Sequence, residues 1–189
     1  MRLLLASQSP RRRQLLAELG YPIEYISLDV EETTPAGMAA SEVAGYLSRL
    51  KASAYPAEQL AEDQVLVTAD TVVVHQGHVL GKPHSREEAM QMLRTLAGNS
   101  HEVYTGVCLR TRARETSFIE CTHVHFAPLC EEELAYYVDT YRPFDKAGAY
   151  GIQEWIGMVG IRAIEGCYYN VVGLPVARLY SELKKLSKT

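Results

Sequence analysis

The chain has 189 residues, of which 47% are hydrophobic and 22% charged, with 19 basic residues against 23 acidic ones and a net charge of -4. This composition is typical of a globular protein with a sizeable core, and it excludes a protein that coats nucleic acid through bulk charge. Any bound anion must therefore be met by a local cluster of basic residues.

No stretch approaches the roughly 18 apolar residues of a membrane span, and the apolar run near the N-terminus is too short for a signal peptide. The four cysteines have no C-x-x-C spacing, so the sequence predicts neither a zinc site nor a disulfide framework. We expect a cytoplasmic protein with no membrane partner.

The first half of the chain predicts alternating strands and helices. A short apolar strand over residues 3–6 leads to Ser9 and Pro10, the N-cap and first residue of a helix that Gly20 ends. The elements that follow are a strand over 21–28, an acidic loop, a helix from near Ser41 to about residue 55, a long strand, a turn at Gln76–Gly77 and a return strand over 64–80, and a helix between Ser85 and Gly98.

The second half predicts an antiparallel hairpin and two further helices. Strands over 101–111 and 115–129 are joined near residues 112–115, and a short helix follows from Cys130. Another strand lies within 158–166, and a helix begins at Pro175. There is no internal repeat or Pro/Gly-rich linker, so this mixture favours one α/β unit with a mixed sheet.

Three adjacent arginines stand at the start of the first predicted helix. The N–H groups there lack intrahelical partners and favour an anion, and arginines add charge-assisted bonds to phosphate oxygens. The chain has no Walker pattern, so this is not a P-loop. The predicted phosphate cradle consists of Ser7, Ser9, Arg11, Arg12 and Arg13. The alternative is a capped surface helix with solvated arginines.

Asp70, followed by Thr71, lies in the middle of the most apolar predicted strand. Because an unpaired buried carboxylate is costly, Asp70 must face a partner, a metal ion or a water-filled cleft. The alternative to a catalytic role is an ion pair with a buried lysine or a loop cap.

Other charged residues are weaker candidates. Glu31 and Glu32 are either ligands for Mg²⁺, which one or two carboxylates hold together with substrate phosphates, or solvated loop residues. Lys51 and Lys82 are either point charges for phosphate or ordinary surface lysines.

The segment 144–153, FDKAGAYGIQ, combines small residues that allow close backbone approach with Asp145, Lys146 and the amide of Gln153, which has both donors and an acceptor for a base edge. The alternative is a tight packing turn. Asn170 and Gly173 form a second turn, or a plain helix entry. The six histidines receive no role, because no third metal ligand accompanies the pair that shares a strand face.

These stretches together resemble the Maf family of nucleoside triphosphate pyrophosphatases. The matching segments, in chain order, are LLLASQSPRRRQLLAELG, VEET, RLKA, TADTVV, GKP, AGNSHEVYTGV, DKAGAYGIQ and NVVGLP. The resemblance extends over nearly the whole chain and implies a single domain over residues 1–189. It implies an α/β fold related to that of inosine triphosphate pyrophosphatases, a single mixed-sheet unit with two lobes around a cleft. It also implies cleavage of a nucleoside triphosphate between its α and β phosphates, with Mg²⁺ or Mn²⁺.

Carried over by position, the resemblance makes Asp70 the general base for the attacking water and, with Glu32, a metal ligand. The residues implied to be catalytic are Asp70, Glu32 and Lys82. Those implied to bind the substrate are Ser7, Arg11, Arg12, Lys51, Thr71 and Gln153. Within this set, the positions linked to base choice are Arg12, Thr71 and Gln153.

The identities of those three residues resemble the group acting on dTTP and UTP, also described as acting on modified pyrimidine nucleotides. A 7-methyl-GTP pyrophosphatase of the same family and a non-catalytic nucleotide-binding regulator of cell division remain alternatives, although the presence of both Asp70 and Glu32 speaks against a dead site. The resemblance is compatible with a homodimer, and the expected partner is a nucleotide rather than a nucleic acid.

Overall fold

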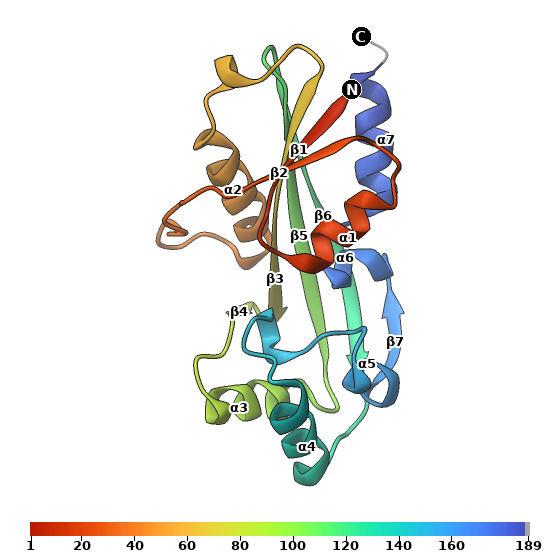
Figure 1. The fold of residues 1–189 in the computed structure, drawn as a ribbon. Helices are drawn as coiled ribbons and strands as arrows, with labels where there is room; N and C mark the ends of the chain where they lie inside the picture. The colour runs from red at the N-terminus through yellow and green to blue at the C-terminus, as the bar shows by residue number, and fades with distance from the viewer. Residues whose placement is uncertain (188–189) are drawn as a thin grey trace. The chain divides into compact units, whose positions relative to one another are not determined.

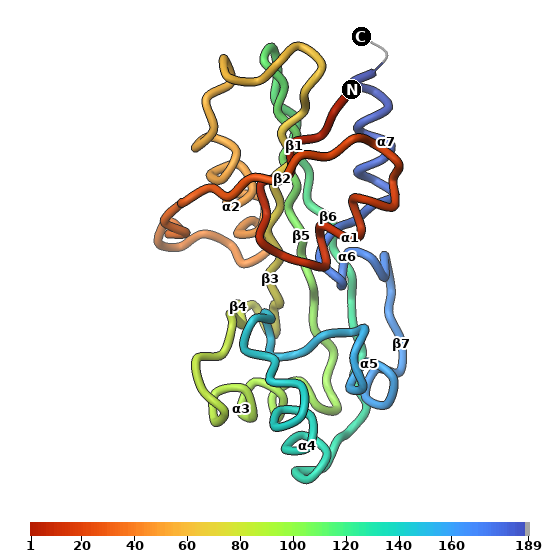
Figure 2. The backbone as a smooth tube through the Cα atoms, in the orientation of Figure 1, coloured from red at the N-terminus to blue at the C-terminus, as the bar shows by residue number. Residues whose placement is uncertain are grey.

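The computed structural model describes residues 1–187, which form helices around one seven-stranded sheet of order β2-β1-β3-β5-β6-β7, with β4 paired to β3 (Figures 1 and 2). The strands are β1 (Arg2–Ala6), β2 (Ile23–Ile26), β3 (Gln64–His75), β4 (His78–Leu80), β5 (Ser100–Arg110), β6 (Glu115–Phe126) and β7 (Ile161–Glu165). The helices are α1 (Pro10–Ala17), α2 (Ala40–Ser53), α3 (Arg86–Leu96), α4 (Glu131–Tyr141), α5 (Trp155–Gly160), α6 (Tyr168–Val172) and α7 (Val176–Leu186), with short 3₁₀ turns η1 (Ala57–Gln59) and η2 (Ala147–Ala149).

The sheet is mixed. β1 pairs in parallel with both β2 and β3, whereas β3 with β4 and β6 with β7 pair antiparallel. The prediction of an α/β fold with a single mixed sheet is therefore confirmed.

The chain divides into two compact units. Unit 1 comprises residues 1–70, 105–120 and the chain from Gly173 onward, and unit 2 comprises residues 71–104 and 121–172. Strands β3, β5 and β6 each contribute residues to both units. That residues 1–189 act as a single domain stays a prediction.

In unit 1, the parallel strands β1 and β3 are buried on both faces, whereas β2 is partly exposed. Because alternate residues of a strand face opposite sides, Leu5 of β1 packs with Leu16 of α1 and Leu179 of α7. Its neighbour Leu4 packs on the other side with Ala52 of α2. Figure 1 shows the same arrangement, with α1 and α7 on one side of these strands and α2 on the other. Burial on both faces explains why β1 and the first part of β3 read as continuous apolar runs.

The mainly aliphatic core of unit 2 contains a cluster of aromatic rings. His101, Phe126 and Tyr150 pack with ring centroids 5.1–5.5 Å apart, and the Nε2 atom of His101 lies 2.7 Å from the Tyr150 hydroxyl. Burial lowers the pKa of His101 to about 3, so its ring is neutral in the folded protein. This histidine is a core residue.

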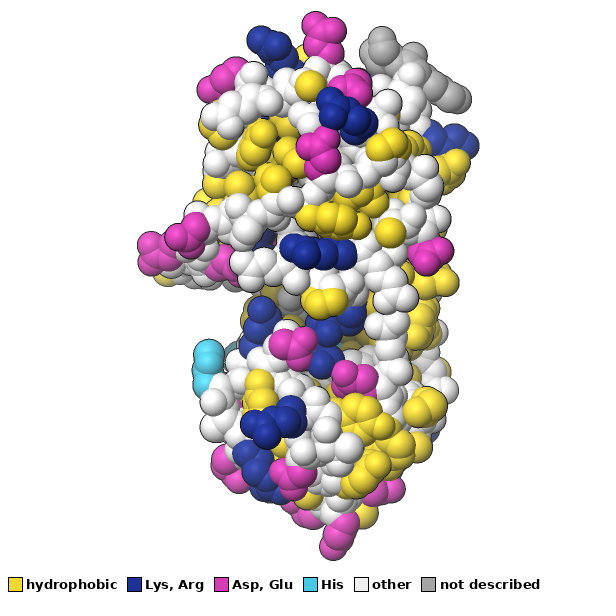
Figure 3. Space-filling model, viewed as in Figure 1, with side chains coloured by type: hydrophobic (Ala, Val, Ile, Leu, Met, Phe, Trp, Pro, Cys, Tyr) yellow, Lys and Arg dark blue, Asp and Glu magenta, His cyan; other side chains and the backbone are white. Residues whose placement is uncertain are grey.

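On the surface of unit 2, ion pairs link α3 to α4. Arg86 binds Asp139 through two bonds of 2.6 and 2.8 Å, and Arg94 binds Glu131 similarly at 2.8 and 3.0 Å. Figure 3 shows basic and acidic side chains interspersed over these helices, with no continuous basic stripe on the face drawn.

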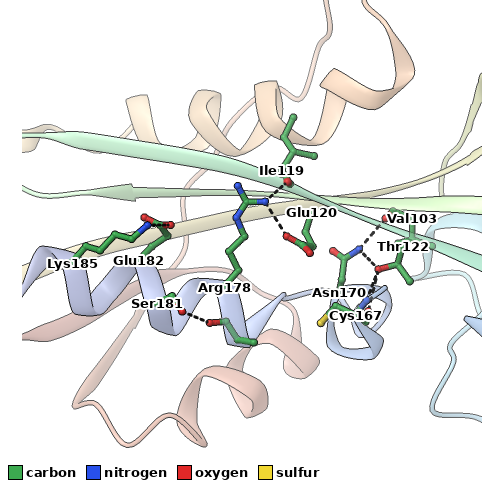
Figure 4. Close-up of polar contacts among 11 residues, drawn as sticks. Val103, Ile119, Glu120, Thr122, Cys167, Asn170, Arg178, Ser181, Glu182 and Lys185 are labelled. Atoms are coloured by element: carbon green, nitrogen blue, oxygen red, sulfur yellow. Dashed lines mark hydrogen bonds and ion pairs between the residues drawn. The ribbon is translucent and has the colours of Figure 1, made fainter. Parts of the chain in front are cut away.

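Asn170, from the NVVGLP segment, holds α6 in place (Figure 4). Its Nδ2 donates to the Val103 carbonyl at 2.9 Å and to Thr122 Oγ1 at 3.0 Å, and the Cys167 N–H donates to the same Oγ1 at 3.0 Å. These bonds tie α6 to β5 and β6, so Asn170 does more than introduce the final helix.

Local signals located most elements correctly. Ser9 caps α1, Ser85 caps α3, and Gln76 and Gly77 form the turn with positive φ between β3 and β4. The short helices α5 and α6 were not predicted, and β2 is shorter than the expected strand over 21–28. Within residues 1–187, no helix has the length and apolar character needed to cross a membrane.

Candidate active site

At the start of α1, serine hydroxyl oxygens accept hydrogen bonds from the main-chain N–H groups. The N–H of Arg12 donates to Ser9 Oγ at 3.4 Å, and the N–H of Ser9 donates to Ser7 Oγ at 3.2 Å. Pro10, the first helical residue, has no N–H. The hydroxyl oxygens of Ser7 and Ser9, which belong to the expected phosphate cradle, thus already accept hydrogen bonds from the chain itself. The roles of Ser7 and Arg11 in binding phosphate stay predictions.

Arg12 ties α1 to two other segments of unit 1. Its Nε donates to the Gly173 carbonyl at 2.8 Å, and its Nη1 donates to the Ala69 carbonyl at 2.9 Å. Burial lowers the pKa of Arg12. Since Ala69 precedes Asp70, the guanidinium holds the middle of β3, which carries the candidate catalytic carboxylate.

Arg13, which the sequence analysis included in the phosphate cradle, instead anchors the turn between β1 and α1. Its Nε donates to the Ser7 carbonyl at 3.0 Å, and its guanidinium lies over the Tyr25 ring at 5.1 Å from the ring centroid. It therefore acts on the main chain of the turn.

Regular spacing on β3 and α2 brings Asp70 to Lys51. Thr68 and Asp70 lie two residues apart on one face of β3, and Ser48 and Lys51 lie three residues apart on one face of α2. Thr68 Oγ1 donates to the Ser48 carbonyl at 2.6 Å, and Lys51 Nζ lies 2.6 Å from Asp70 Oδ1. The two contacts therefore join β3 and α2 at successive positions along the same pair of elements.

Gly106 of β5 allows α2 to approach the sheet this closely. A Cβ atom at Gly106 would lie 2.2 Å from the carbonyl oxygen of Ala44, a separation that no side chain tolerates. The AGNSHEVYTGV segment supplies this glycine, so one of its functions is to position the helix that carries Lys51.

Glu32, from the loop between β2 and α2, completes a cluster of three charges. Lys51 Nζ lies 3.0 Å from Glu32 Oε1, and the side chains of Lys51 and Asp70 are 15% and 12% exposed, against 51% for Glu32. One partly buried ammonium therefore faces one buried and one half-exposed carboxylate. The structure brings together Glu32, Lys51 and Asp70, as an ion-pair cluster that the sequence considered only as an alternative for Asp70.

The candidate residues of unit 1 gather at the carboxyl ends of parallel strands. Ser7 and the arginines follow β1, and Glu32 follows β2. Asp70 lies on β3 beyond Val67, the last residue that pairs with β1. Ligands of α/β sheets bind at this edge.

Glu32 and Asp70 fit a divalent cation such as Mg²⁺ or Mn²⁺. Hard cations prefer carboxylate oxygens, and one oxygen from each residue already converges within 3.0 Å of a single positive charge, the Lys51 ammonium. No group of three or more His, Cys, Asp or Glu side chains within residues 1–187 is placed to hold a metal ion. Further ligands would come from water and substrate phosphates, as is usual for Mg²⁺.

The remaining candidates lie in unit 2. Thr71 is partly buried on β3, Lys82 is exposed between β4 and α3, and Gln153 is exposed in the turn before α5. The Gly148 N–H donates to the Gly81 carbonyl at 3.0 Å, which joins the segment of Lys82 to η2, shortly before the turn of Gln153. The roles of Thr71, Lys82 and Gln153 stay predictions.

Unit 2 also contains a buried lysine with two carboxylate partners, of which the sequence revealed only one. Lys146, with a side chain 10% exposed, lies 2.8 Å from Asp145 Oδ1 and 3.0 Å from Glu154 Oε1. The neighbouring pair in DKAGAYGIQ was visible in the sequence. The contact with Glu154 could not be predicted from helix or strand periodicity, because two tight turns lie between Lys146 and Glu154 in the sequence.

A family model described as "Maf-like protein" matches residues 2–186 of the chain. The chain belongs to the Maf family. This Maf protein is 51% identical over 185 residues to the dTTP/UTP pyrophosphatase of Bacteroides thetaiotaomicron, covering 97% of this chain and 95% of the relative. It is 49% identical over 190 residues to the dTTP/UTP pyrophosphatase of Porphyromonas gingivalis, covering 100% and 96%. Among solved structures, the Staphylococcus aureus Ham1 protein is similar with a TM-score of 0.47 and 15% identity, covering 67% of this chain and 72% of that one.

Proposed function

We propose that the protein hydrolyses dTTP and UTP to the nucleoside monophosphate and pyrophosphate. Its membership of the Maf family and its similarity along nearly the whole chain to relatives named dTTP/UTP pyrophosphatase support this proposal. The structural observation that carries it is the Glu32–Lys51–Asp70 cluster at the carboxyl ends of parallel strands, where a polyphosphate and a cation have suitable partners.

In the proposed reaction, Asp70 accepts the proton of the water that cleaves the anhydride between the α and β phosphates. Lys51 keeps this carboxylate in place through its 2.6 Å contact. Glu32 and Asp70 would hold a divalent cation, which would supply neutralisation of phosphate charge when bound. Arg11, Arg12, Lys51 and Lys82 provide further positive charge for the phosphates, with Ser7 as a hydrogen-bonding partner.

Base choice is assigned to Arg12, Thr71 and Gln153. The amide of Gln153 offers both a donor and an acceptor, and uracil and thymine share the carbonyl and N3–H pattern that such an amide matches. Cytosine presents an amino group instead, so binding it would leave polar groups unpaired. This accounts for a pyrimidine enzyme that accepts dTTP and UTP together.

The proposed setting is the cytoplasm, with residues 1–189 working as one domain and Mg²⁺ or Mn²⁺ as cofactor. A homodimer stays a prediction, which light scattering during size-exclusion chromatography would test.

The test is a screen for pyrophosphate release from dTTP, UTP, dCTP, CTP and 7-methyl-GTP with Mg²⁺ or Mn²⁺. Asp70→Asn should lower kcat by at least about 100-fold while still folding. Asp139→Asn is the matched control, because Asp139 is exposed and paired with Arg86 on unit 2. A preference for 7-methyl-GTP would overturn the proposed substrate. Binding without turnover would favour a regulator, and release of orthophosphate instead would refute the proposed bond cleavage.

A further inference from the structure

The turn that carries Gln153 is closed by its own main chain. The N–H of Glu154 donates to the Gly151 carbonyl at 3.0 Å. Gln153 is the one exposed side chain of residues 151–154, since Gly151, Ile152 and Glu154 are partly buried. The positions of the two ends of the turn therefore set the point from which the Gln153 amide projects.

A single oxygen atom joins both ends of this turn. Tyr137 of α4 is fully buried, its hydroxyl donates to Glu154 Oε2, and the N–H of Gly151 donates to the same hydroxyl at 3.0 Å. Burial, together with the hydrogen bond to Glu154, raises the pKa of Tyr137. The phenol thus stays protonated, and it remains a donor to the carboxylate.

The other contacts of the turn leave it little room to move. Glu154 Oε1 is held by Lys146 at 3.0 Å. A Cβ atom on Gly151 would lie 3.0 Å from the Lys146 side chain, and one on Gly157 would lie 1.8 Å from the Ile152 carbonyl oxygen. The turn is packed on both sides while Gln153 faces solvent.

From these contacts we infer that Tyr137 is a positioning residue for base specificity, because its hydroxyl holds the turn that presents Gln153 to the pyrimidine base. The inference rests on the proposed function, in which Gln153 reads the base. A pre-organised amide rejects a base with the wrong donors and acceptors, whereas a mobile one adapts to it. Tyr137 therefore acts on the choice of base, through Gln153, and touches no reacting atom.

Tyr137→Phe removes the hydroxyl and keeps the ring. Amide hydrogen exchange followed by NMR should show that the Gly151 N–H exchanges at least about tenfold faster, while the amides of α4 keep their protection. In kinetics, the ratio of kcat/KM for dTTP to that for dCTP should fall by about tenfold, with a smaller change in kcat for dTTP. The exchange measurement tests the contact without relying on any activity.

Tyr136→Phe and Tyr141→Phe are matched controls on the same helix. Tyr136 is 49% exposed, and Tyr141 stacks on Tyr137 at 5.2 Å between ring centroids. Both variants should keep wild-type exchange and selectivity. Glu154→Ala is the second perturbation, because it removes the acceptor of the phenol and leaves the Tyr137 ring packed. It should change exchange and selectivity in the same direction as Tyr137→Phe.

Three experimental outcomes distinguish a failure of the proposed function from a failure of the inference about Tyr137. If the wild-type protein cleaves neither dTTP nor UTP, the proposed function fails, whatever the exchange data show. If it cleaves them and neither Tyr137→Phe nor Glu154→Ala alters the dTTP to dCTP ratio, the inference is wrong and the contacts are structural only. Unchanged exchange at Gly151 in Tyr137→Phe overturns it equally.

Discussion

Replacing Lys51 by methionine should expose the cost of leaving Asp70 without its counter-ion. Lys51 and Asp70 are 15% and 12% exposed and lie 2.6 Å apart, so their pair is largely shielded from solvent and approaches the behaviour of a buried pair. Removing one partner of a buried pair costs about 3–5 kcal/mol, whereas the contact with Glu32, which is 51% exposed, adds at most about 1 kcal/mol. We expect Lys51→Met to lose about 3 kcal/mol of unfolding free energy, which lowers Tm by roughly 6–12 °C.

The assay is urea unfolding at pH 7 without nucleotide or metal. Lys185→Met is the control, because the contact of Lys185 with Glu182 involves a lysine that is 70% exposed, and its loss should cost less than about 0.5 kcal/mol. The double variant Lys51→Met/Asp70→Asn should recover more than half of the lost unfolding free energy, since it also removes the Asp70 charge that Lys51→Met leaves without its counter-ion. Equal losses for the two single lysine variants, or no recovery in the double variant, would refute the reasoning.

Three further predictions concern stability. Arg12→Lys should cost about 2 kcal/mol in urea unfolding, because lysine cannot bond the Ala69 and Gly173 carbonyls together; an unchanged midpoint would contradict this. Gly106→Ala should cost about 3 kcal/mol or more through the clash with Ala44, whereas Gly81→Ala, in open space, should change the midpoint little. His101 has a pKa near 3 in the folded state against 6.5 ordinarily, so its contribution is complete above pH 6.5 and is lost as the pH falls toward 3. Between pH 7 and 5 this amounts to about 2 kcal/mol, and His101→Phe should remove that part of the pH dependence; an equally steep loss in the variant would count against it.

Local signals predicted the parts of the fold that depend on neighbouring residues. Ser9 with Pro10 and Ser85 with Gly98 mark helix ends by chemistry that acts within a few residues, and both helices are confirmed. The helices α5 and α6 span only six and five residues, and the sequence shows no capping pattern for them. Their formation depends on tertiary contacts such as those of Asn170.

The candidate site was predicted as a set of residues, but without its contacts. The sequence left Asp70 with a metal, water or a lysine as partner, because Lys51 and Asp70 are 19 positions apart along the chain, a separation that carries no periodic signal. Likewise, nothing local indicates that Arg12 bonds a carbonyl 161 residues away. Such pairings follow from how strands and helices pack, which spacing along the chain does not encode.

The alternation of side chains along β3 has a consequence for evolution. Asp70 projects to the face where α2 lies, and Thr71, the next residue, projects to the opposite one. If the carboxylate drives hydrolysis and the threonine contributes to base choice, natural selection can exchange one without rebuilding the surroundings of the other. New nucleotide preferences are then accessible by single substitutions that leave the hydrolytic machinery intact.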